Sequence, residues 1–270
     1  DLQRFSQGRF MLGIGSQVRA HIERRFGIDF DPPAARMREY ILAVKAFFDC
    51  WQHDEPLQFE GHYYNHSLMT PMFNPGPLEQ GPPPVLLGAV GPKMTGVAGE
   101  VADGLIVHPF NTVPFIREQQ LPALERGREK RQLNGQPQNV NAEYICQIGA
   151  ICVTGSTEEE YQAAEHTVKG LLAFYGSTPA YRPPMDAVGY GELQPELNKL
   201  SKQGRWDEMS ALIDEDFLQA FAVCGEPATI AAQLKNRYAD TATRLSIYAP
   251  YLLPDLVWQG ILADLKEQTD

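Results

Sequence analysis

The sequence lacks several patterns that would assign a function at once. Its four cysteines form no C-x-x-C pair, and its six histidines show no H-E-x-x-H spacing. Cys50, Cys146, Cys152 and Cys224 lie in apolar segments, which predicts reduced core residues in a cytoplasmic protein. We therefore expect no metal site.

Long hydrophobic runs and an excess of basic residues are also missing. No window has the length and apolarity of a bilayer-spanning helix, and no signal segment opens the chain. The 23 basic residues stand against 34 acidic ones, and this net charge of −11 argues against a nucleic-acid partner. We expect a small-molecule substrate, no nucleic acid and no membrane. The apolar helix faces and the acidic charge are compatible with a homodimer.

What the sequence does contain is an alternation of short apolar strands and amphipathic helices. Strands are expected at 9–15, 85–88, 104–107, 141–153 and 244–249. Helices are expected after Asp31-Pro32-Pro33, at 92–102, from a Thr112 cap to about 131, after a Ser156-x-x-Glu159 capping box, near 206–222, and at 227–239 and 254–266. A hairpin at 57–64 turning at Glu60-Gly61, an irregular connection at 71–84 and a long excursion at 176–205 complete the prediction.

Five strand–helix units in this order indicate a parallel sheet flanked by helices. A closed (β/α)8 barrel needs eight units, and the first strand here has only eight residues before it. We therefore expect a single domain over residues 1–270 with about three units missing from its front, and an excursion of helices and loops at about 176–240. A five-stranded open sheet is the alternative.

The segment from Val85 to Ile106 is the most informative one for function. A short apolar strand runs into a turn with Gly88, Gly91 and Pro92, a helix opens at once, and a second strand follows. The first N–H groups of a helix have no partners within it, and the helix dipole adds positive potential there. The segment is therefore a candidate phosphate site, or alternatively a glycine-rich connection that binds nothing.

Four ordered motifs carry a resemblance to a known family. They are Arg9–Gly27, which starts RFMLGIGSQVRAHIERR, the segment Gly88–Leu105, the run HPFNT at 108–112, and AFYGSTPAYR at 173–182. Together they resemble the bacterial luciferase-like monooxygenases, and in particular the branch of coenzyme F420-dependent oxidoreductases. The resemblance implies a TIM barrel that holds a deazaflavin or flavin at the carboxyl ends of its strands, with the strand at 9–15 as the fourth of eight.

The resemblance also implies site residues. Cofactor contacts are expected from Gly13, Gly15, Ser16, Gln17, Gly88, Ala89, Gly91, Pro92, Lys93 and Met94. Arg19, His21 and His108 are the catalytic candidates, although Arg19 and His21 are equally readable as partners of nearby carboxylates in an ordered loop, and His108 as a structural residue. Tyr175, Ser177, Thr178, Tyr181 and Arg182 are expected in a lid that shapes substrate choice.

The implied chemistry is hydride transfer between coenzyme F420 and a small organic substrate. A glutamate that donates a proton in some relatives has no counterpart in the run Ser16-Gln17-Val18-Arg19. The alternatives are an FMN-dependent monooxygenase and a flavin-binding barrel without turnover. The barrel strands expected in front of this chain would supply part of the ring pocket, so a chain without them is expected to bind the cofactor poorly.

Overall fold

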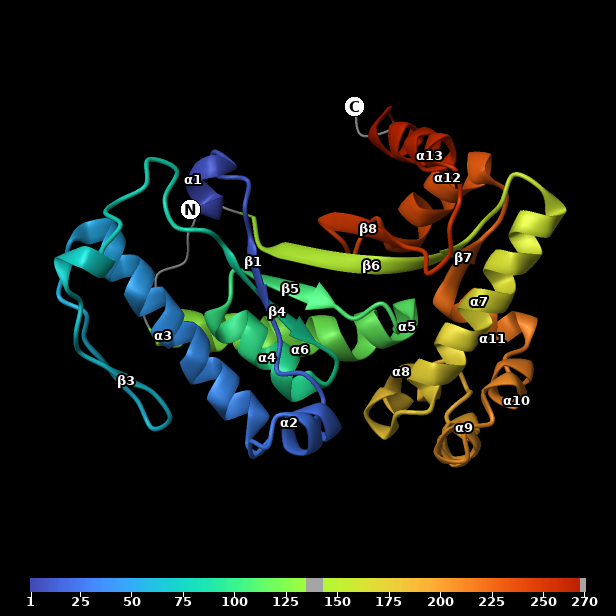
Figure 1. Ribbon diagram of the computed structural model, residues 1–270, viewed down its shortest axis with the longest axis horizontal. Helices are drawn as coiled ribbons and strands as arrows, with labels where there is room; N and C mark the ends of the chain where they lie inside the picture. The colour runs from blue at the N-terminus through green and yellow to red at the C-terminus, as the bar shows by residue number, and fades with distance from the viewer. Residues whose placement is uncertain (135–142, 268–270) are drawn as a thin grey trace. The chain divides into compact units, whose positions relative to one another are not determined.

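The computed structural model of the protein describes residues 1–134 and 143–267 (Figure 1). The chain divides into two compact units, Asp1–Ile106 with Pro122–Ile145, and Val107–Leu121 with Cys146–Asp270. Each unit combines parallel strands with helices. The fold is therefore the α/β fold with a parallel sheet that the strand–helix alternation predicts.

In the first unit, three strands are neighbours in the order β1 (Leu12–Ile14), β4 (Val85–Ala89) and β5 (Gly104–Val107). β1 and β4 run parallel, with Gly13 opposite Leu86. Val85, Leu86 and Leu87 are almost fully buried, as expected for a parallel strand with both faces covered. The helices are α1 (Leu2–Phe5), α2 (Arg19–Arg25), α3 (Pro33–His53), α4 (Pro92–Val101) and α6 (Leu121–Leu133).

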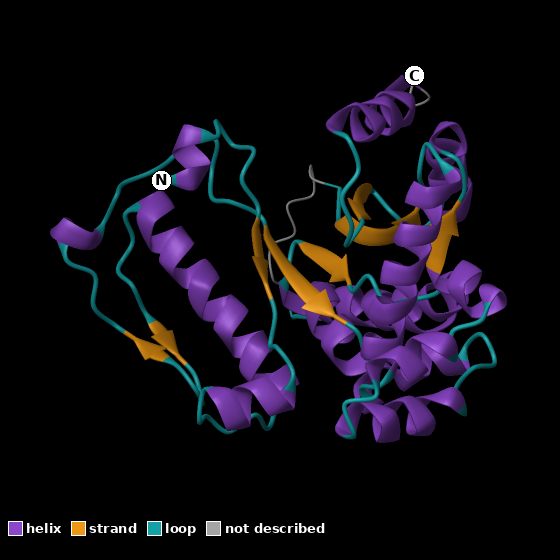
Figure 2. Cartoon of the chain, turned by 45° about the vertical axis from the view of Figure 1, so that its right-hand side comes forward, coloured by secondary structure: helices purple, strands orange, loops and turns teal. Residues whose placement is uncertain are grey.

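In the second unit, β6 (Ile145–Val153) pairs in parallel with both β7 (Ala222–Cys224) and β8 (Arg244–Tyr248). Most of the remaining chain is helical (Figure 2). The helices are α5 (Val113–Phe115), a π-helical turn (Ile116–Gln120), α7 (Glu158–Gly176), a 3₁₀ turn (Pro179–Tyr181), α8 (Arg182–Asp186), α9 (Leu193–Lys202), α10 (Trp206–Ala211), α11 (Glu215–Phe221), α12 (Pro227–Tyr238) and α13 (Asp255–Glu267). Phe110, Val168, Leu172 and Phe217 form part of the core between them.

Two predicted helix caps are wrong because the side chains have other partners. Pro32 precedes α3, no side chain caps that helix, and the Asp31 carboxylate pairs with Arg19 instead. Thr112 does stand directly before α5. Its hydroxyl, however, donates to the carbonyl of Pro184 at 3.3 Å rather than capping the helix.

The capping box of α7 exists but is displaced by one residue from the predicted Ser156-x-x-Glu159. Thr157 Oγ1 accepts a hydrogen bond from the N–H of Glu160 at 3.2 Å. The Glu160 carboxylate in turn accepts from the N–H of Ser156 at 2.7 Å. The return bond goes to Ser156, one residue before the N-cap Thr157, so the arrangement is a variant of the capping box. The run of three glutamates after Thr157 makes the register ambiguous in the sequence.

The predicted hairpin forms with a different turn. β2 (Phe59–Glu60) pairs antiparallel with β3 (Asn65–His66), so the turn spans 61–64. The hairpin lies alongside α3 (Figure 2), where the Glu39 carboxylate accepts from the N–H groups of His62, Tyr63 and Tyr64 at 2.9, 2.5 and 2.7 Å. Burial acts to raise the pKa of Glu39, but these three bonds outweigh it and lower that pKa.

Several predicted boundaries need correction. The excursion at 176–205 is largely helical, since it contains the 3₁₀ turn, α8 and α9. The strand expected at 9–15 is reduced to Leu12–Ile14, and the loop after it contains α2. The strand expected at 141–153 begins at Ile145, and residues 141–142 lie outside the described part. β7 was not predicted.

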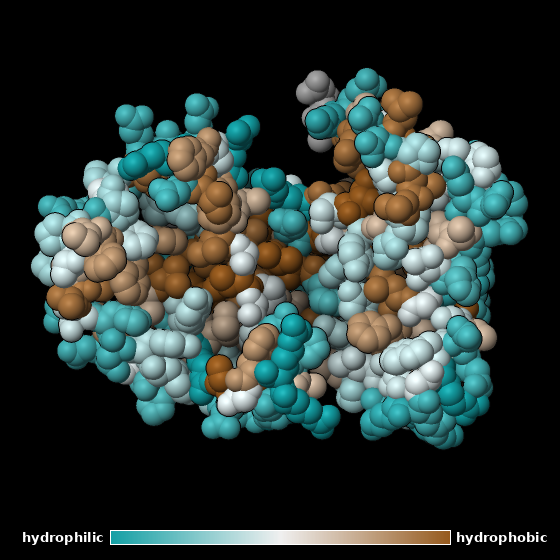
Figure 3. Space-filling model, viewed as in Figure 1, coloured by the Kyte–Doolittle hydropathy of each residue, from teal (hydrophilic) through white to brown (hydrophobic). Residues whose placement is uncertain are grey.

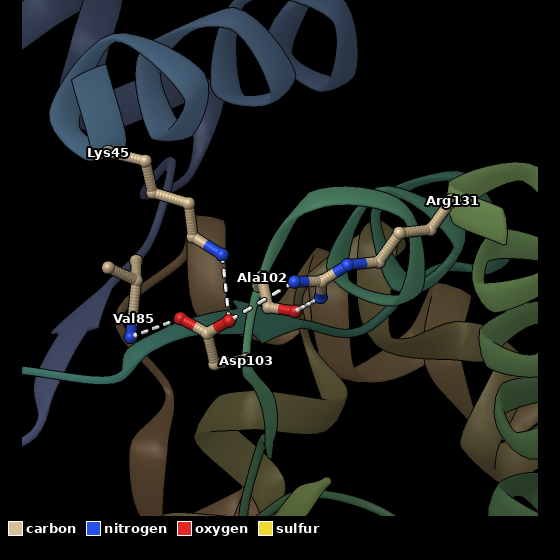
Figure 4. A network of polar contacts seen from close by, with 5 residues as sticks. All are labelled: Lys45, Val85, Ala102, Asp103 and Arg131. Carbon is tan, nitrogen blue, oxygen red and sulfur yellow. Dashed lines mark hydrogen bonds and ion pairs between the residues drawn. The ribbon is translucent and has the colours of Figure 1, made fainter. Parts of the chain in front are cut away.

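The amino ends of β4 and β5 are tied to the helices by the carboxylate of Asp103 (Figure 4). Its Oδ2 accepts from the N–H of Val85 at 3.0 Å. Its Oδ1 lies 2.7 Å from Lys45 Nζ on α3 and 3.5 Å from Arg131 Nη2 on α6. Arg131 also donates to the carbonyl of Ala102 at 2.7 Å. One carboxylate thus joins a strand and two helices.

Glycines allow α4 and α6 to approach at backbone distance. A Cβ added to Gly99 would lie 2.2 Å from the Leu124 carbonyl oxygen, and one added to Gly127 would lie 2.1 Å from that of Gly96. Side chains cannot occupy such space without a backbone shift. The position of α4 therefore depends on these two residues having no side chain.

The surface and the cysteines agree with the compositional expectations that can be tested. Figure 3 shows a face that is mostly hydrophilic, with hydrophobic residues gathered in several places. Leu252 and Leu256 are among the exposed large hydrophobic residues. All four cysteines are free, three of them buried. Among the described helices, none has the length and apolarity required to cross a membrane.

Candidate functional site

The carboxyl ends of β1 and β4 lie at one edge of the first unit's sheet. The register pairs Ile14 with Leu87, so Gly15 and Gly88 follow at the same edge. A Cβ on Gly88 would sit 3.4 Å from the Ile14 carbonyl oxygen, whereas one on Gly15 would meet nothing within 4 Å. Parallel α/β folds bind their ligands at this edge. The open space beside Gly15 would let a ligand approach the backbone there.

The loop after β1 has an unusual backbone. Gln17 has a φ of 57°, in the left-handed region that a non-glycine residue seldom adopts. The Ser16 hydroxyl donates to the carbonyl of Gln17 at 3.3 Å. Left-handed residues cluster at binding sites, so this conformation is a second reason to keep Ser16 and Gln17 as candidates.

The amino end of α4 has the features of an anion site. Gly91 is the N-cap, with φ −80° and ψ 157°, and no side chain caps the helix. The backbone N–H and the hydroxyl of Thr95 both bond to the Gly91 carbonyl, each at 3.1 Å. A Cβ on Gly91 would meet nothing within 4 Å, and Lys93 is exposed. The N–H groups of Lys93 and Met94 precede the first helical donor and have no acceptor within the helix.

Arg19 and His21 open the short helix α2, and both are exposed. The Arg19 guanidinium lies 2.6 Å from Glu23, also pairs with Asp31, and stands 5.0 Å from the centre of the Phe30 ring. The hydrogen bond to Asp31, followed by that to Glu23, raises the pKa of Arg19. Arg19 is thus held in the ordered-loop arrangement that the sequence offered as its second interpretation.

His108, in the second unit, follows the carboxyl end of β5. Its Nδ1 accepts from the N–H of Phe110 at 3.1 Å, and its Nε2 lies 3.3 Å from the Tyr181 hydroxyl. Burial lowers the pKa of His108 to about 4. The imidazolium form is disfavoured because burial among aromatic side chains removes it from water.

Two tyrosine rings contact the His108 imidazole, and Phe110 packs against both of them. The Tyr181 ring stacks on the imidazole at 4.7 Å, and Tyr175 of α7 meets it edge-on at 5.0 Å. Phe110 lies 5.9 Å from both tyrosine rings. Burial raises the pKa of Tyr181, and burial together with the Tyr248 hydroxyl, 3.4 Å away, raises that of Tyr175. Both phenols are therefore protonated at neutral pH.

The other expected lid residues have structural partners. The Ser177 hydroxyl donates to Phe174 O at 2.7 Å, and Thr178 is the N-cap of the 3₁₀ turn that contains Tyr181. Arg182 pairs with Asp186 at 3.3 Å and with Glu192 at 2.6 Å. The segment brings Tyr175 and Tyr181 to His108, whereas Ser177, Thr178 and Arg182 make contacts within the segment itself.

Sequence reasoning missed two residues of this cluster. Asn111 Nδ2 donates to the carbonyl of His108, while its Oδ1 is buried without a hydrogen-bond partner among the described residues. Tyr248 is the last residue of β8. Its position at the carboxyl end of a predicted parallel strand is a sequence signal that could have marked it as a site candidate. Its contact with Tyr175 is visible only in the fold.

Comparisons with known proteins identify the family of the chain. The family described as Luciferase-like monooxygenase matches residues 1–244. An uncharacterised protein of Mycobacterium tuberculosis is 43% identical over 245 residues, which are 91% of this chain and 70% of that protein. The F420-dependent glucose-6-phosphate dehydrogenase of Kineococcus radiotolerans is 34% identical over 122 residues, 45% of this chain and 34% of that enzyme.

A solved structure supports the fold. The coenzyme F420 dependent tetrahydromethanopterin reductase from Methanopyrus kandleri superimposes with a TM-score of 0.71 at 22% identity, covering 97% of this chain and 74% of that one. The strand order, the glycine-bearing edge and the family match over most of the chain lead to one conclusion. The protein belongs to the luciferase-like monooxygenase family.

Proposed function

We propose that the protein is an oxidoreductase that transfers hydride between coenzyme F420 and a small organic substrate. The observation that carries the proposal is the uncapped amino end of α4 at the carboxyl edge of β1 and β4. The similarity to an F420-dependent dehydrogenase supports it. Both features favour a cofactor whose tail carries phosphate.

The residues present fit an anionic cofactor tail. The side of Gly91 is open, the first N–H groups of α4 have no acceptor within the helix, and Lys93 adds an exposed positive charge. Residues 88–94 would hold the phosphate, and Gly13, Gly15, Ser16 and Gln17 would contact the cofactor along the neighbouring strand end. When bound, the deazaflavin supplies the hydride chemistry, and the protein supplies position and electrostatics.

The catalytic candidates take different roles in this proposal. His108 is neutral at pH 7 because its pKa lies near 4, so it acts through hydrogen bonds rather than as a cationic acid. Arg19 shares its charge with two carboxylates, which favours a role in ordering the loop after β1. His21 is exposed on α2 and is retained as a candidate for substrate contact.

An FMN-dependent monooxygenase is the second candidate function, favoured by the description of the family. A phosphate at α4 would serve either cofactor. A titration of the natural full-length protein with coenzyme F420 and with FMN, oxidised and reduced, separates the two by fluorescence quenching. Tight binding of FMN alone would replace the proposal by the monooxygenase, and binding of neither would refute the anion site.

The decisive variants are Gly91→Asp and Gly91→Asn. The backbone at Gly91 suits an N-cap, and both side chains fit into open space, so either stabilises α4 by a few tenths of a kcal/mol. Only aspartate places a negative charge where the phosphate is proposed to bind. We expect Gly91→Asp to weaken cofactor binding at least tenfold more than Gly91→Asn, with the melting temperatures of both preserved.

Equal affinities of the two variants and the parent would refute the α4 site. Equal and large losses of cofactor affinity in both variants would mean that the cofactor occupies the space beside Gly91, and that a negative charge there does not affect its binding. Lys93→Gln provides a further check. Loss of this exposed cation is expected to weaken binding less than the negative charge introduced by Gly91→Asp does.

A further inference from the structure

The hydrogen-bond pattern around His108 defines its tautomer. The Phe110 N–H donates to Nδ1 at 3.1 Å, so Nδ1 carries no proton. The neutral imidazole therefore has its proton on Nε2. Nε2 lies 3.3 Å from the Tyr181 hydroxyl, and it is the donor in that contact.

This tautomer determines what Tyr181 can do. Because its oxygen accepts from His108, its own hydrogen remains available to another acceptor. Among the described residues, none accepts a hydrogen bond from the Tyr181 hydroxyl. The Tyr181 ring is held by stacking on the imidazole and by edge contact with Tyr175, so the hydroxyl has a defined place.

The charges around this hydroxyl are also defined. His108 is neutral, and Tyr175 bonds to another phenol, Tyr248. The adjacent cation, Arg182, is already paired with Asp186 and Glu192. Phosphate and carboxylate groups are bound most strongly by charged donors or by several backbone N–H groups together. This cluster offers a neutral donor and aromatic surfaces instead.

We propose that Tyr181 donates a hydrogen bond to an uncharged oxygen of the substrate, a carbonyl in one direction of the reaction and a hydroxyl in the other, and that His108 is the residue that positions Tyr181. The substrate class is thus an uncharged aldehyde, ketone or alcohol with an apolar body. This inference rests on the proposed function, which it deepens by naming the substrate class.

Two matched probes test the substrate class on the natural full-length protein. 4′-Fluoroacetophenone carries a neutral carbonyl, and 4-fluorophenyl phosphate carries an anion on the same type of ring. Binding is followed by fluorine NMR, without turnover. We expect Tyr181→Phe to weaken ketone binding at least fivefold and to leave the affinity for the phosphate unchanged, because any phosphate binding at the start of α4 does not involve Tyr181. Tyr190→Phe removes a phenol that bonds to Asp214 outside the cluster and is expected to leave the affinity unchanged.

The positioning role of His108 has its own readout. Nitrogen NMR of labelled imidazole is expected to show Nε2 protonated and Nδ1 unprotonated at pH 7. The amide nitrogen of glutamine can replace Nε2 as donor, so His108→Gln is expected to retain most ketone affinity, and His108→Phe to lose it as far as Tyr181→Phe does. A structural role alone would make the two His108 variants alike.

Several outcomes overturn the inference. They are a wild-type protein that does not bind the ketone, binding of the phosphate ester that Tyr181→Phe weakens, unchanged ketone affinity in Tyr181→Phe, and a protonated Nδ1. The cofactor titration is repeated on Tyr181→Phe. Failure of every variant to bind a cofactor would refute the proposed function alone, because the ketone measurement does not depend on it.

Discussion

Removal of the Asp103 carboxylate is expected to destabilise the first unit substantially. In Asp103→Ala the Val85 N–H loses a charged acceptor at 3.0 Å, and Lys45 loses its partner at 2.7 Å. The Arg131 contact, at 3.5 Å, contributes less, because Arg131 keeps its bond to the Ala102 carbonyl. The Asp103 side chain is 30% exposed and that of Lys45 24%, so solvent screens part of the interaction.

These contacts give an expected loss of about 2–3 kcal/mol, below the 3–5 kcal/mol typical of a fully buried pair that loses one member. For a chain of this length the melting temperature would fall by about 5 °C. Calorimetry and urea denaturation measure both quantities. Asp49→Ala is the matched control, because Asp49 is an exposed carboxylate one turn after Lys45 on α3 that attracts Lys45 through space, whereas Asp103 also accepts from the Val85 N–H. It is expected to change stability by less than about 0.5 kcal/mol.

A double-mutant cycle with Lys45→Ala isolates the ion pair. We expect a coupling energy of about 1 kcal/mol between Asp103 and Lys45, within the range for partly exposed pairs. Equal stabilities of Asp103→Ala and Asp49→Ala would refute the reasoning, because they would show that the network contributes nothing to folding.

Three further predictions concern other contacts. Gly99→Ala is expected to destabilise by about 2 kcal/mol or more, since its Cβ meets backbone, while Gly96→Ala, whose Cβ would be 3.6 Å from its nearest atom, is expected to be tolerated in the same urea denaturation. The lowered pKa of Glu39 means that its contribution to stability is present above its ordinary pKa of 4.5 and is lost as the pH falls through the folded value. The protection factor of the Tyr63 amide, which is its exchange rate relative to the intrinsic rate at the same pH, should therefore fall in acid and, at neutral pH, in Glu39→Gln. The pKa of His108 is lowered from 6.5 to about 4, so its contribution to the free energy of unfolding is complete above pH 6.5 and falls by up to about 3 kcal/mol towards pH 4. His108→Gln should remove this pH dependence from the free energy of unfolding measured in urea.

The sequence predicts the local α/β pattern well wherever short-range signals agree. The unit β4–α4–β5 is confirmed almost to the residue, because an apolar run, a glycine–proline turn and an amphipathic helix follow each other without competing signals. The helices within 176–205 are not evident from the sequence, because the local signals there conflict. The prolines suggest loops, yet Pro179 and Pro183 stand in the first turns of helical segments, where a missing N–H does no harm.

The candidate site shows a similar division. Glycines at strand ends and a helix start beneath them are visible in the sequence, so the edge formed by Gly15, Gly88 and Gly91 was predictable. The state of His108 was not, because its low pKa arises from rings that come from α7 and the 3₁₀ turn. The ion pair of Arg19 with Asp31 is likewise not predictable from the sequence, because it depends on the conformation of the loop between them.

The close contact between α4 and α6 has a consequence for how binding preferences can change. The main-chain amides at the start of α4 are present whatever side chains surround them, and the packing of Gly99 and Gly127 prevents the helix from sliding. The anion recognition proposed for this helix would therefore depend little on most side chains in the loop before it. Neighbouring positions such as Lys93 could vary and tune the affinity. With such an arrangement, a lineage could exchange one phosphate-bearing cofactor for another while its scaffold stays the same.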